Sequence, residues 1–299
     1  MAIAKFGRVI TAMITPFKEN GDVNYEGASS LSKYHGSEGI LVGGTTGEGA
    51  TMSSEEKLKL YKMIVDAVGK NGTEKRVSVI GNVGTIGTKE TIEFLKEAEK
   101  TGIDAALVIV PFYVKPTQEG MYQHFKAIAE STELPIILYN VPGRVGVSIQ
   151  PETIKRLTDV CPNIVGVKDA AGNWDQVTKE KILLPDDFMI YSGDDAFTLP
   201  VLAAGGVGVI SVASHVIGED LLSMIDAFEK GNLAAARRLH LKMYPIMKGM
   251  FFIASPIPVK TAVNLIGQPG GNFRLPMVAP TKEEESHVRT LLENYGFLL

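Results

Sequence analysis

Eight short apolar runs, each followed by an amphipathic stretch, constrain the fold of this chain more than any other feature. The runs are rich in Val and Ile and are continuous rather than alternating, which is typical of strands covered on both faces in a parallel sheet. They are Val9–Ile14, Gly39–Val42, Arg76–Ile80, Ala105–Val110, Pro135–Tyr139, Ile164–Val167, Phe188–Tyr191 and Val207–Val212. Eight strand–helix units of about 28 residues predict an α/β fold of the (β/α)₈ TIM-barrel type. An open doubly wound sheet is the alternative, because the pattern alone does not show whether a parallel sheet closes.

The stretches between the runs carry helix signals. Ser53 and Glu56 have the spacing of a capping box, and Pro151 suits the first position of a helix. Gly231 suits the residue just past a helix end. The first helix, expected around Tyr25–His35, has the weakest signal, because glycines and serines dilute it. It also looks short near its end, at Tyr34 to Gly36, so we expect a truncated or frayed helix there.

The pattern changes after Gly231, where only helical stretches follow. These are Leu233–Phe252, Pro256–Leu265 and Thr281–Asn294. We therefore expect a catalytic barrel domain over residues 1–231 and a C-terminal helical extension over residues 232–299.

Composition narrows the classes of protein to consider. The formal charge of −4 leaves no basic surface for nucleic acid. The longest strongly apolar stretch, Ala105 to Val114, is too short to span a bilayer, and the first 16 residues do not resemble a signal peptide. A single cysteine, Cys161, allows no intrachain disulfide, which is compatible with a reducing compartment. Because neither a membrane span nor a signal peptide is expected, a cytoplasmic location is the expectation.

Polar and unusual residues collect after the predicted strands, where a barrel of this type places its chemistry. They are Gly43–Gly49 after the second run, Pro111–Tyr113 after the fourth, Tyr139–Arg144 after the fifth, Lys168–Asp169 after the sixth and Ser192–Asp195 after the seventh.

Lys168 is the most informative of these residues. It follows an apolar strand, where burial disfavours the ammonium form and favours the neutral amine that attacks a ketone. The alternative is a lysine that reaches solvent or pairs with Asp169. Position alone does not decide between the two.

The other candidates support a site for small carboxylates. Glycines in Gly43–Gly49 let backbone N–H groups approach an anion, and Thr45 and Thr46 add hydroxyl donors. Tyr139 and Tyr113 can exchange protons, and Arg144 can bind a carboxylate through two hydrogen bonds. Taken singly, each of these residues can equally be structural.

Metal binding is poorly supported by the pattern. The five histidines are scattered without ligand spacing, and His215, the one near the predicted site, is expected to be structural. Asp194 and Glu48 are the carboxylates that a metal-dependent barrel aldolase could use, which keeps that class as a competing hypothesis. A small-acid binding protein without turnover is the non-enzymatic alternative.

Three motifs carry a resemblance to a known family. Gly44-Thr45-Thr46-Gly47-Glu48, Tyr139-Asn140-Val141-Pro142-Gly143-Arg144 and Gly166-Val167-Lys168-Asp169 resemble the signatures of the dihydrodipicolinate synthase family, within the N-acetylneuraminate lyase superfamily of class I aldolases. The similarity runs over essentially the whole chain and includes the segment Pro256-Ile257-Pro258-Val259-Lys260.

The resemblance implies a reaction and a set of roles. Pyruvate would condense with L-aspartate 4-semialdehyde through a Schiff base on Lys168, in lysine and diaminopimelate biosynthesis, with no metal or organic cofactor. Tyr139, Thr45 and Tyr113 would form a proton relay, with Tyr113 reaching in from the neighbouring subunit. The resemblance also implies a homotetramer built as a dimer of dimers.

Substrate contacts follow from the same resemblance. Thr46 would hold the pyruvate carboxylate, Arg144 would bind the carboxylate of the aldehyde, and the carbonyl groups of Gly193 and Ile210 would line the pocket. Arg144 favours this reaction over the alternative in the same superfamily, an N-acetylneuraminate or 2-keto-3-deoxy sugar acid lyase, whose acceptor carries a polyhydroxylated chain.

One departure from the family concerns feedback by lysine. Members inhibited by lysine carry histidine, asparagine, glutamate and tyrosine side chains in a cleft at the dimer interface. The matching positions here are Ser54, Lys57, Thr85, Lys89 and Phe112. Two cations therefore stand where the ammonium groups of the inhibitor need acceptors, and we expect no inhibition by lysine.

Overall fold

Eight parallel strands form a closed barrel, with neighbouring strands in chain order from β1 to β8. The computed structural model describes residues 3–34, 36–69 and 77–299. The strands are β1 (Val9–Ala12), β2 (Gly39–Val42), β3 (Ser78–Asn82), β4 (Ala105–Ile109), β5 (Ile136–Asn140), β6 (Ile164–Asp169), β7 (Met189–Ser192) and β8 (Gly208–Ser211). The barrel prediction is confirmed, and the open sheet is wrong, because β1 pairs with both β2 and β8.

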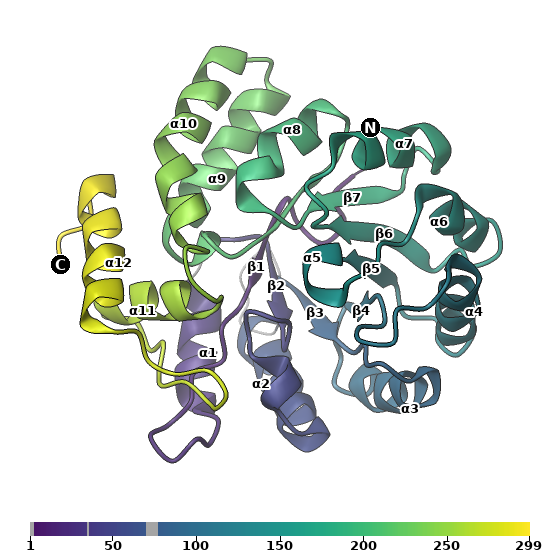
Figure 1. Cartoon of the computed structure of the whole chain (residues 1–299), viewed down its shortest axis with the longest axis horizontal. Coiled ribbons are helices and arrows are strands. Elements are labelled where there is room, and N and C mark those ends of the chain that lie inside the picture. The colour runs from purple at the N-terminus through teal and green to yellow at the C-terminus, as the bar shows by residue number, and fades with distance from the viewer. Residues whose placement is uncertain (1–2, 35, 70–76) are drawn as a thin grey trace.

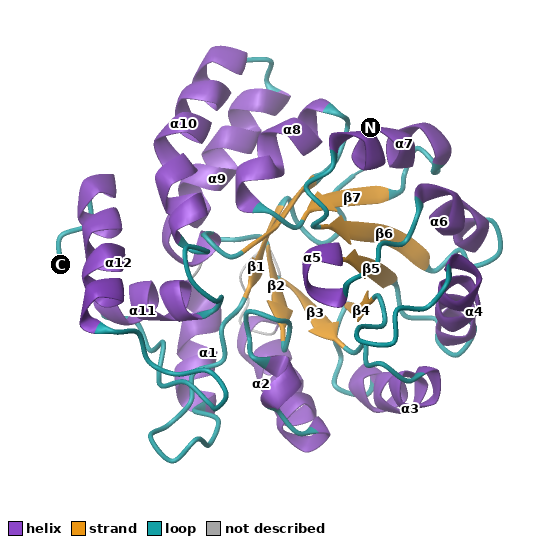
Figure 2. Cartoon of the chain, in the orientation of Figure 1, coloured by secondary structure: helices purple, strands orange, loops and turns teal. Residues whose placement is uncertain are grey.

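Helices surround the barrel, as Figure 2 shows. They are α1 (Tyr25–Tyr34), α2 (Ser54–Gly69), α3 (Thr88–Glu99), α4 (Gln118–Ala129), α5 (Pro142–Val145), α6 (Pro151–Thr158), α7 (Trp174–Leu183), α8 (Thr198–Ala203) and α9 (Ser214–Glu229). Three more follow the barrel: α10 (Leu233–Gly249), α11 (Ile257–Leu265) and α12 (Lys282–Tyr295). Helix α10 packs along α9, and α12 packs against both α10 and α11 at one side of the barrel (Figure 1).

The local signals read from the sequence account for several helix ends. Ser53 and Glu56 form the predicted capping box, with Ser53 N–H donating to Glu56 Oε2 at 2.8 Å and Glu56 N–H donating to Ser53 Oγ at 3.1 Å. Pro151 is the first residue of α6, and Gly231 takes a φ of 75° after α9. Helix α1 is short, with ten residues. Arg76 and His35, which the sequence placed in a strand and a helix, lie outside the described residues.

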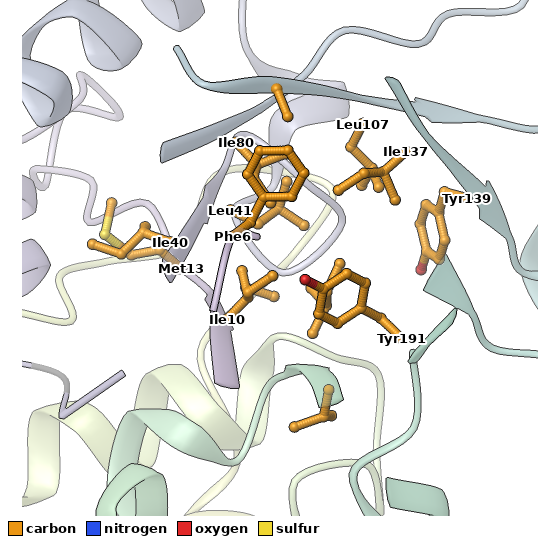
Figure 3. Close-up of a cluster of buried hydrophobic side chains, with 14 of the residues drawn as sticks. Phe6, Ile10, Met13, Ile40, Leu41, Ile80, Leu107, Ile137, Tyr139 and Tyr191 are labelled. Atoms are coloured by element: carbon orange, nitrogen blue, oxygen red, sulfur yellow. The ribbon is translucent and has the colours of Figure 1, made fainter. Parts of the chain in front are cut away.

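The core of the barrel is filled by side chains that converge from several strands. Figure 3 shows Ile10 of β1, Ile80 of β3, Leu107 of β4 and Tyr191 of β7 around a common centre. All are 1% exposed or less, so the barrel interior is a packed core and not a channel. Chemistry is therefore confined to the end where the strands terminate.

The division of the chain at Gly231 into a barrel domain and an extension stays a prediction.

Within the described residues, no helix has both the length and the apolar character needed to cross a membrane.

Candidate active site

A cavity of about 420 Å³ lies at the carboxyl end of the barrel. The loops after β2, β5, β6, β7 and β8 all contribute to its wall. The residues that line it are Thr45, Thr46, Tyr139, Val141, Gly143, Arg144, Lys168, Ala170, Gly193, Asp194, Val212, Lys248, Phe251 and Ser255. Six of the eight residues that the sequence singled out for catalysis and substrate binding thus share one cavity.

Lys168 and Tyr139 are direct neighbours on adjacent strands. The pairing of β5 with β6 places Tyr139 opposite Lys168, and both side chains point into the barrel end. Lys168 is 5% exposed and Tyr139 6%, and Lys168 Nζ lies 4.4 Å from the centroid of the tyrosine ring. The structure therefore presents a buried amine next to a phenol, a combination suited to imine formation and proton transfer.

A buried polar network holds the ends of these two strands. Asn140 Nδ2 donates to Asp169 Oδ2 at 2.8 Å, and Gln176 Nε2 of α7 donates to the same oxygen at 3.0 Å. Burial raises the pKa of the Asp169 carboxyl, and these hydrogen bonds oppose the increase. Since Asn140 and Asp169 directly follow Tyr139 and Lys168, the network fixes the register of the reactive pair. Asp169 is engaged in this network, and the described residues show no ion pair between it and Lys168, which was one of the two structural alternatives for that lysine.

The loop Gly43–Gly49 has a tightly folded backbone. Gly43 adopts a φ of 70°, and a Cβ at Gly49 would lie 1.8 Å from the carbonyl oxygen of Gly43. Only glycine fits at such a close approach. The compact turn places Thr45 and Thr46 on the cavity wall, with Thr46 5% exposed.

Arg144 lies on α5, a single turn that begins with Val141 as its N-cap and Pro142 at its first position. The sequence did not predict this helix. The side chain of Arg144 is exposed and lines the cavity. It forms no hydrogen bond or ion pair with any residue that the structure describes. A guanidinium without a protein partner at the opening of a cavity is available to an incoming carboxylate.

Three lining residues come from the segment after α9 and were missed by the sequence analysis. Lys248 belongs to α10, Phe251 follows it, and Ser255 lies just before α11. No local signal could have found them, because only the folding of α10 back along α9 brings these residues to the barrel. Asp194, which the sequence offered as a ligand under the metal hypothesis, lines the cavity. Its Oδ1 accepts the N–H of Ala196 at 2.9 Å and so caps the turn that follows β7.

Two predicted site residues do not line this cavity. Tyr113 follows β4, is 87% exposed, and takes a φ of 69°, which is rare for a residue with a side chain. Ile210 lies within β8 and is 1% exposed, whereas Val212, two residues further on, lines the wall. The roles assigned to Tyr113 and Ile210 stay predictions.

His215 and Glu48 have structural partners. The backbone N–H of Ile14 donates to His215 Nε2 at 3.1 Å, and His215 Nδ1 lies 2.8 Å from the carbonyl oxygen of Val212. Burial lowers the pKa of His215 to about 4. Glu48, which the metal hypothesis paired with Asp194, is instead bonded to Lys260 and does not line the cavity.

Comparison with known proteins agrees with this geometry. The model of the dihydrodipicolinate synthetase family matches residues 5–295. The chain belongs to the dihydrodipicolinate synthetase family. A 4-hydroxy-tetrahydrodipicolinate synthase of Desulforamulus reducens is 46% identical over the full length of both chains.

Solved structures of the dihydrodipicolinate synthetase family superpose closely. The enzyme of Cyanidioschyzon merolae, solved with lysine bound, gives a TM-score of 0.94 at 43% identity and covers 98% of this chain and 99% of its own. A structure described as a monomeric dihydrodipicolinate synthase variant gives 0.93 at 40% identity, with 98% of each chain covered. The family resemblance of the sequence motifs is thereby confirmed.

Proposed function

We propose that the chain catalyses the reaction of its relatives, the condensation of pyruvate with L-aspartate 4-semialdehyde to 4-hydroxy-tetrahydrodipicolinate. The observation that carries the proposal is the buried Lys168 amine beside Tyr139, in a cavity that also holds Thr45, Thr46 and Arg144. Full-length similarity to synthases of this name supports it.

The chemistry begins at Lys168. Its neutral amine attacks the ketone carbon of pyruvate, and loss of water leaves a protonated imine. The imine accepts electrons as a proton leaves the methyl carbon, which forms an enamine that attacks the aldehyde carbon of the second substrate. The amine of that substrate then closes a ring on the imine carbon and releases Lys168. Because the protonated imine is the electron sink, the proposal requires no metal or organic cofactor.

Other residues of the site transfer protons and bind the two substrates. Tyr139, Thr45 and Tyr113 of the partner subunit move protons to and from the imine intermediates. Thr46 binds the pyruvate carboxylate, and the free guanidinium of Arg144 binds the carboxylate of the semialdehyde through two hydrogen bonds. The carbonyl groups of Gly193 and Ile210 are assigned to the pocket lining.

The exposure of Tyr113 supports a homo-oligomer. Tyr113 is 87% exposed and held in the left-handed region, a strained conformation of the kind that recurs at functional sites, and in the proposed oligomer a second copy covers it. We propose a tetramer built as a dimer of dimers. Light scattering at micromolar concentration tests the assembly, and a monomer would contradict the proposal. A monomer is a real alternative outcome, because one of the similar structures is described as a monomeric variant.

The cellular setting is part of the same proposal. We place the chain in the cytoplasm, in the biosynthesis of diaminopimelate and lysine. Residues 1–231 are proposed as the catalytic barrel and residues 232–299 as an extension that completes the cavity through Lys248, Phe251 and Ser255.

An assay with several acceptors tests the function. Pyruvate is supplied with L-aspartate 4-semialdehyde, with N-acetylmannosamine, or with glyceraldehyde, and consumption of pyruvate is followed. We expect turnover with the semialdehyde and at most a trace with the two sugars, because they lack the carboxylate that Arg144 binds. Efficient turnover with either sugar and none with the semialdehyde would assign the chain to the sugar acid lyases instead.

A further inference from the structure

Glu48 and Lys260 form an ion pair that is closed off from solvent. Lys260 Nζ lies 2.5 Å from Glu48 Oε1, and the two side chains are 0% and 1% exposed. The ammonium also donates to the carbonyl oxygen of Asn272 at 2.6 Å and lies 4.5 Å from the centroid of the Phe17 ring. The second carboxylate oxygen of Glu48 accepts the backbone N–H of Arg274 at 3.3 Å.

Stability alone is a weak explanation for such a pair. Removing two charges from water often costs as much as their attraction returns, and apolar replacements of buried pairs are frequently as stable. Burial lowers the pKa of Lys260, and the charge of Glu48 opposes that effect. The place of the pair in the fold offers a better explanation.

The pair adjoins the turn that carries Thr45 and Thr46, because Glu48 is itself a residue of the loop Gly43–Gly49. Glu48 takes a φ of 51°, a conformation that is costly for a residue with a side chain and that recurs at functional sites. Its N–H donates to the carbonyl oxygen of Thr45 at 3.0 Å and closes the turn that carries Thr45 and Thr46. Lys260 lies in α11, which begins two residues after the cavity-lining Ser255. The pair therefore joins the loop after β2 to the C-terminal helices at the site itself.

We propose that Glu48 and Lys260 are positioning residues, whose buried ion pair holds the loop Gly43–Gly49 so that Thr45 and Thr46 face the substrate. Neither side chain lines the cavity, so both act through the loop. The inference rests on the function proposed above, in which the two threonines bind pyruvate and transfer protons. A displacement of reacting groups by about 1 Å is enough to cost on the order of 100-fold in rate.

Three variants separate positioning from simple support of the fold. Glu48→Gln and Lys260→Met each leave one buried charge without its partner and lower the melting temperature. The double variant removes both charges, so we expect it to regain most of the melting temperature that the single variants lose. The rate at which borohydride traps the pyruvate adduct is measured below the melting transition, at limiting and at saturating pyruvate. We expect it to fall about 10- to 100-fold in the single variants and in the double variant alike.

The matched control lies at the opposite end of the barrel. Glu38 pairs with Arg8 at 2.9 Å just before β1 and β2 begin, so Glu38→Gln lowers the melting temperature and leaves trapping unchanged. A double variant that regains both its melting temperature and wild-type trapping would overturn the proposal, even if the single variants do not fold. A wild-type chain that traps no pyruvate contradicts the proposed function instead, which keeps the two failures distinct.

Discussion

His215 makes the stability of this protein sensitive to acid. Both ring nitrogens are matched in the neutral form, since Nε2 accepts the Ile14 N–H and Nδ1 faces the carbonyl oxygen of Val212. A proton on Nε2 would face the N–H of Ile14 and remove that hydrogen bond. Burial accordingly lowers the pKa of His215 from 6.5 to about 4.

The direction of the change in stability follows from the pH at which the folded and the unfolded chain each protonate His215. The unfolded chain protonates near pH 6.5 and the folded chain only near pH 4, so the stabilisation is complete above 6.5 and is lost as pH falls toward 4. The pKa difference amounts to about 3 kcal/mol when both states are protonated. At pH 5 the loss is about 2 kcal/mol relative to pH 8. His124, whose pKa burial also lowers to about 4, adds a comparable loss.

The assay is urea unfolding at pH 8 and pH 5. Wild type and His287→Gln, which changes an exposed histidine, are expected to lose the same free energy of unfolding between the two pH values. His215→Gln, which cannot titrate, should lose about 2 kcal/mol less. Equal losses in His215→Gln and wild type would refute the assignment of this acid sensitivity to His215.

Three further predictions concern the site. Tyr139→Phe keeps the ring beside Lys168 and is expected to lower kcat about 100- to 10,000-fold, with imine exchange slowed by a similar factor in single-turnover measurements. Arg144→Gln should raise KM for the semialdehyde by about 10- to 100-fold and leave KM for pyruvate nearly unchanged, because it removes one charge-assisted pair worth about 1.5–3 kcal/mol. L-lysine at millimolar concentration should leave the initial rate unchanged, since Lys57 and Lys89 present cations at the positions matching the inhibitor cleft; saturable inhibition below 1 mM would be inconsistent with this.

Much of the fold could be read from the sequence because each strand carries its own signal. Continuous apolar runs located all eight strands, although Arg76 lies outside the described residues. The bounds differ where hydrogen bonding, not composition, ends a strand. Strand β6 extends to Asp169 because Lys168 and Asp169 pair with Tyr139 and Asn140 of β5. Helix α5 was missed because Pro142 and Gly143 are typical of a turn.

The site was predictable where its residues lie at the carboxyl end of a strand or directly after it. Lys168, Tyr139 and Thr45 meet in the cavity because barrel topology brings the carboxyl ends of all strands together. Contacts between distant segments had no such signal. The ion pair of Glu48 with Lys260 joins residues 212 positions apart, and Lys248 reaches the cavity only through the packing of α10.

The most direct measurement of the central claim is reductive trapping of pyruvate. The protein is treated with sodium borohydride in the presence of pyruvate, and the modified peptide is mapped by mass spectrometry. Lys248→Ala serves as the matched control, because it removes the second lysine of the same cavity. We predict one adduct per chain on Lys168, retained in Lys248→Ala and lost in Lys168→Ala. An adduct that survives in Lys168→Ala, or none in the wild type, would contradict the role of Lys168 as the amine that captures pyruvate.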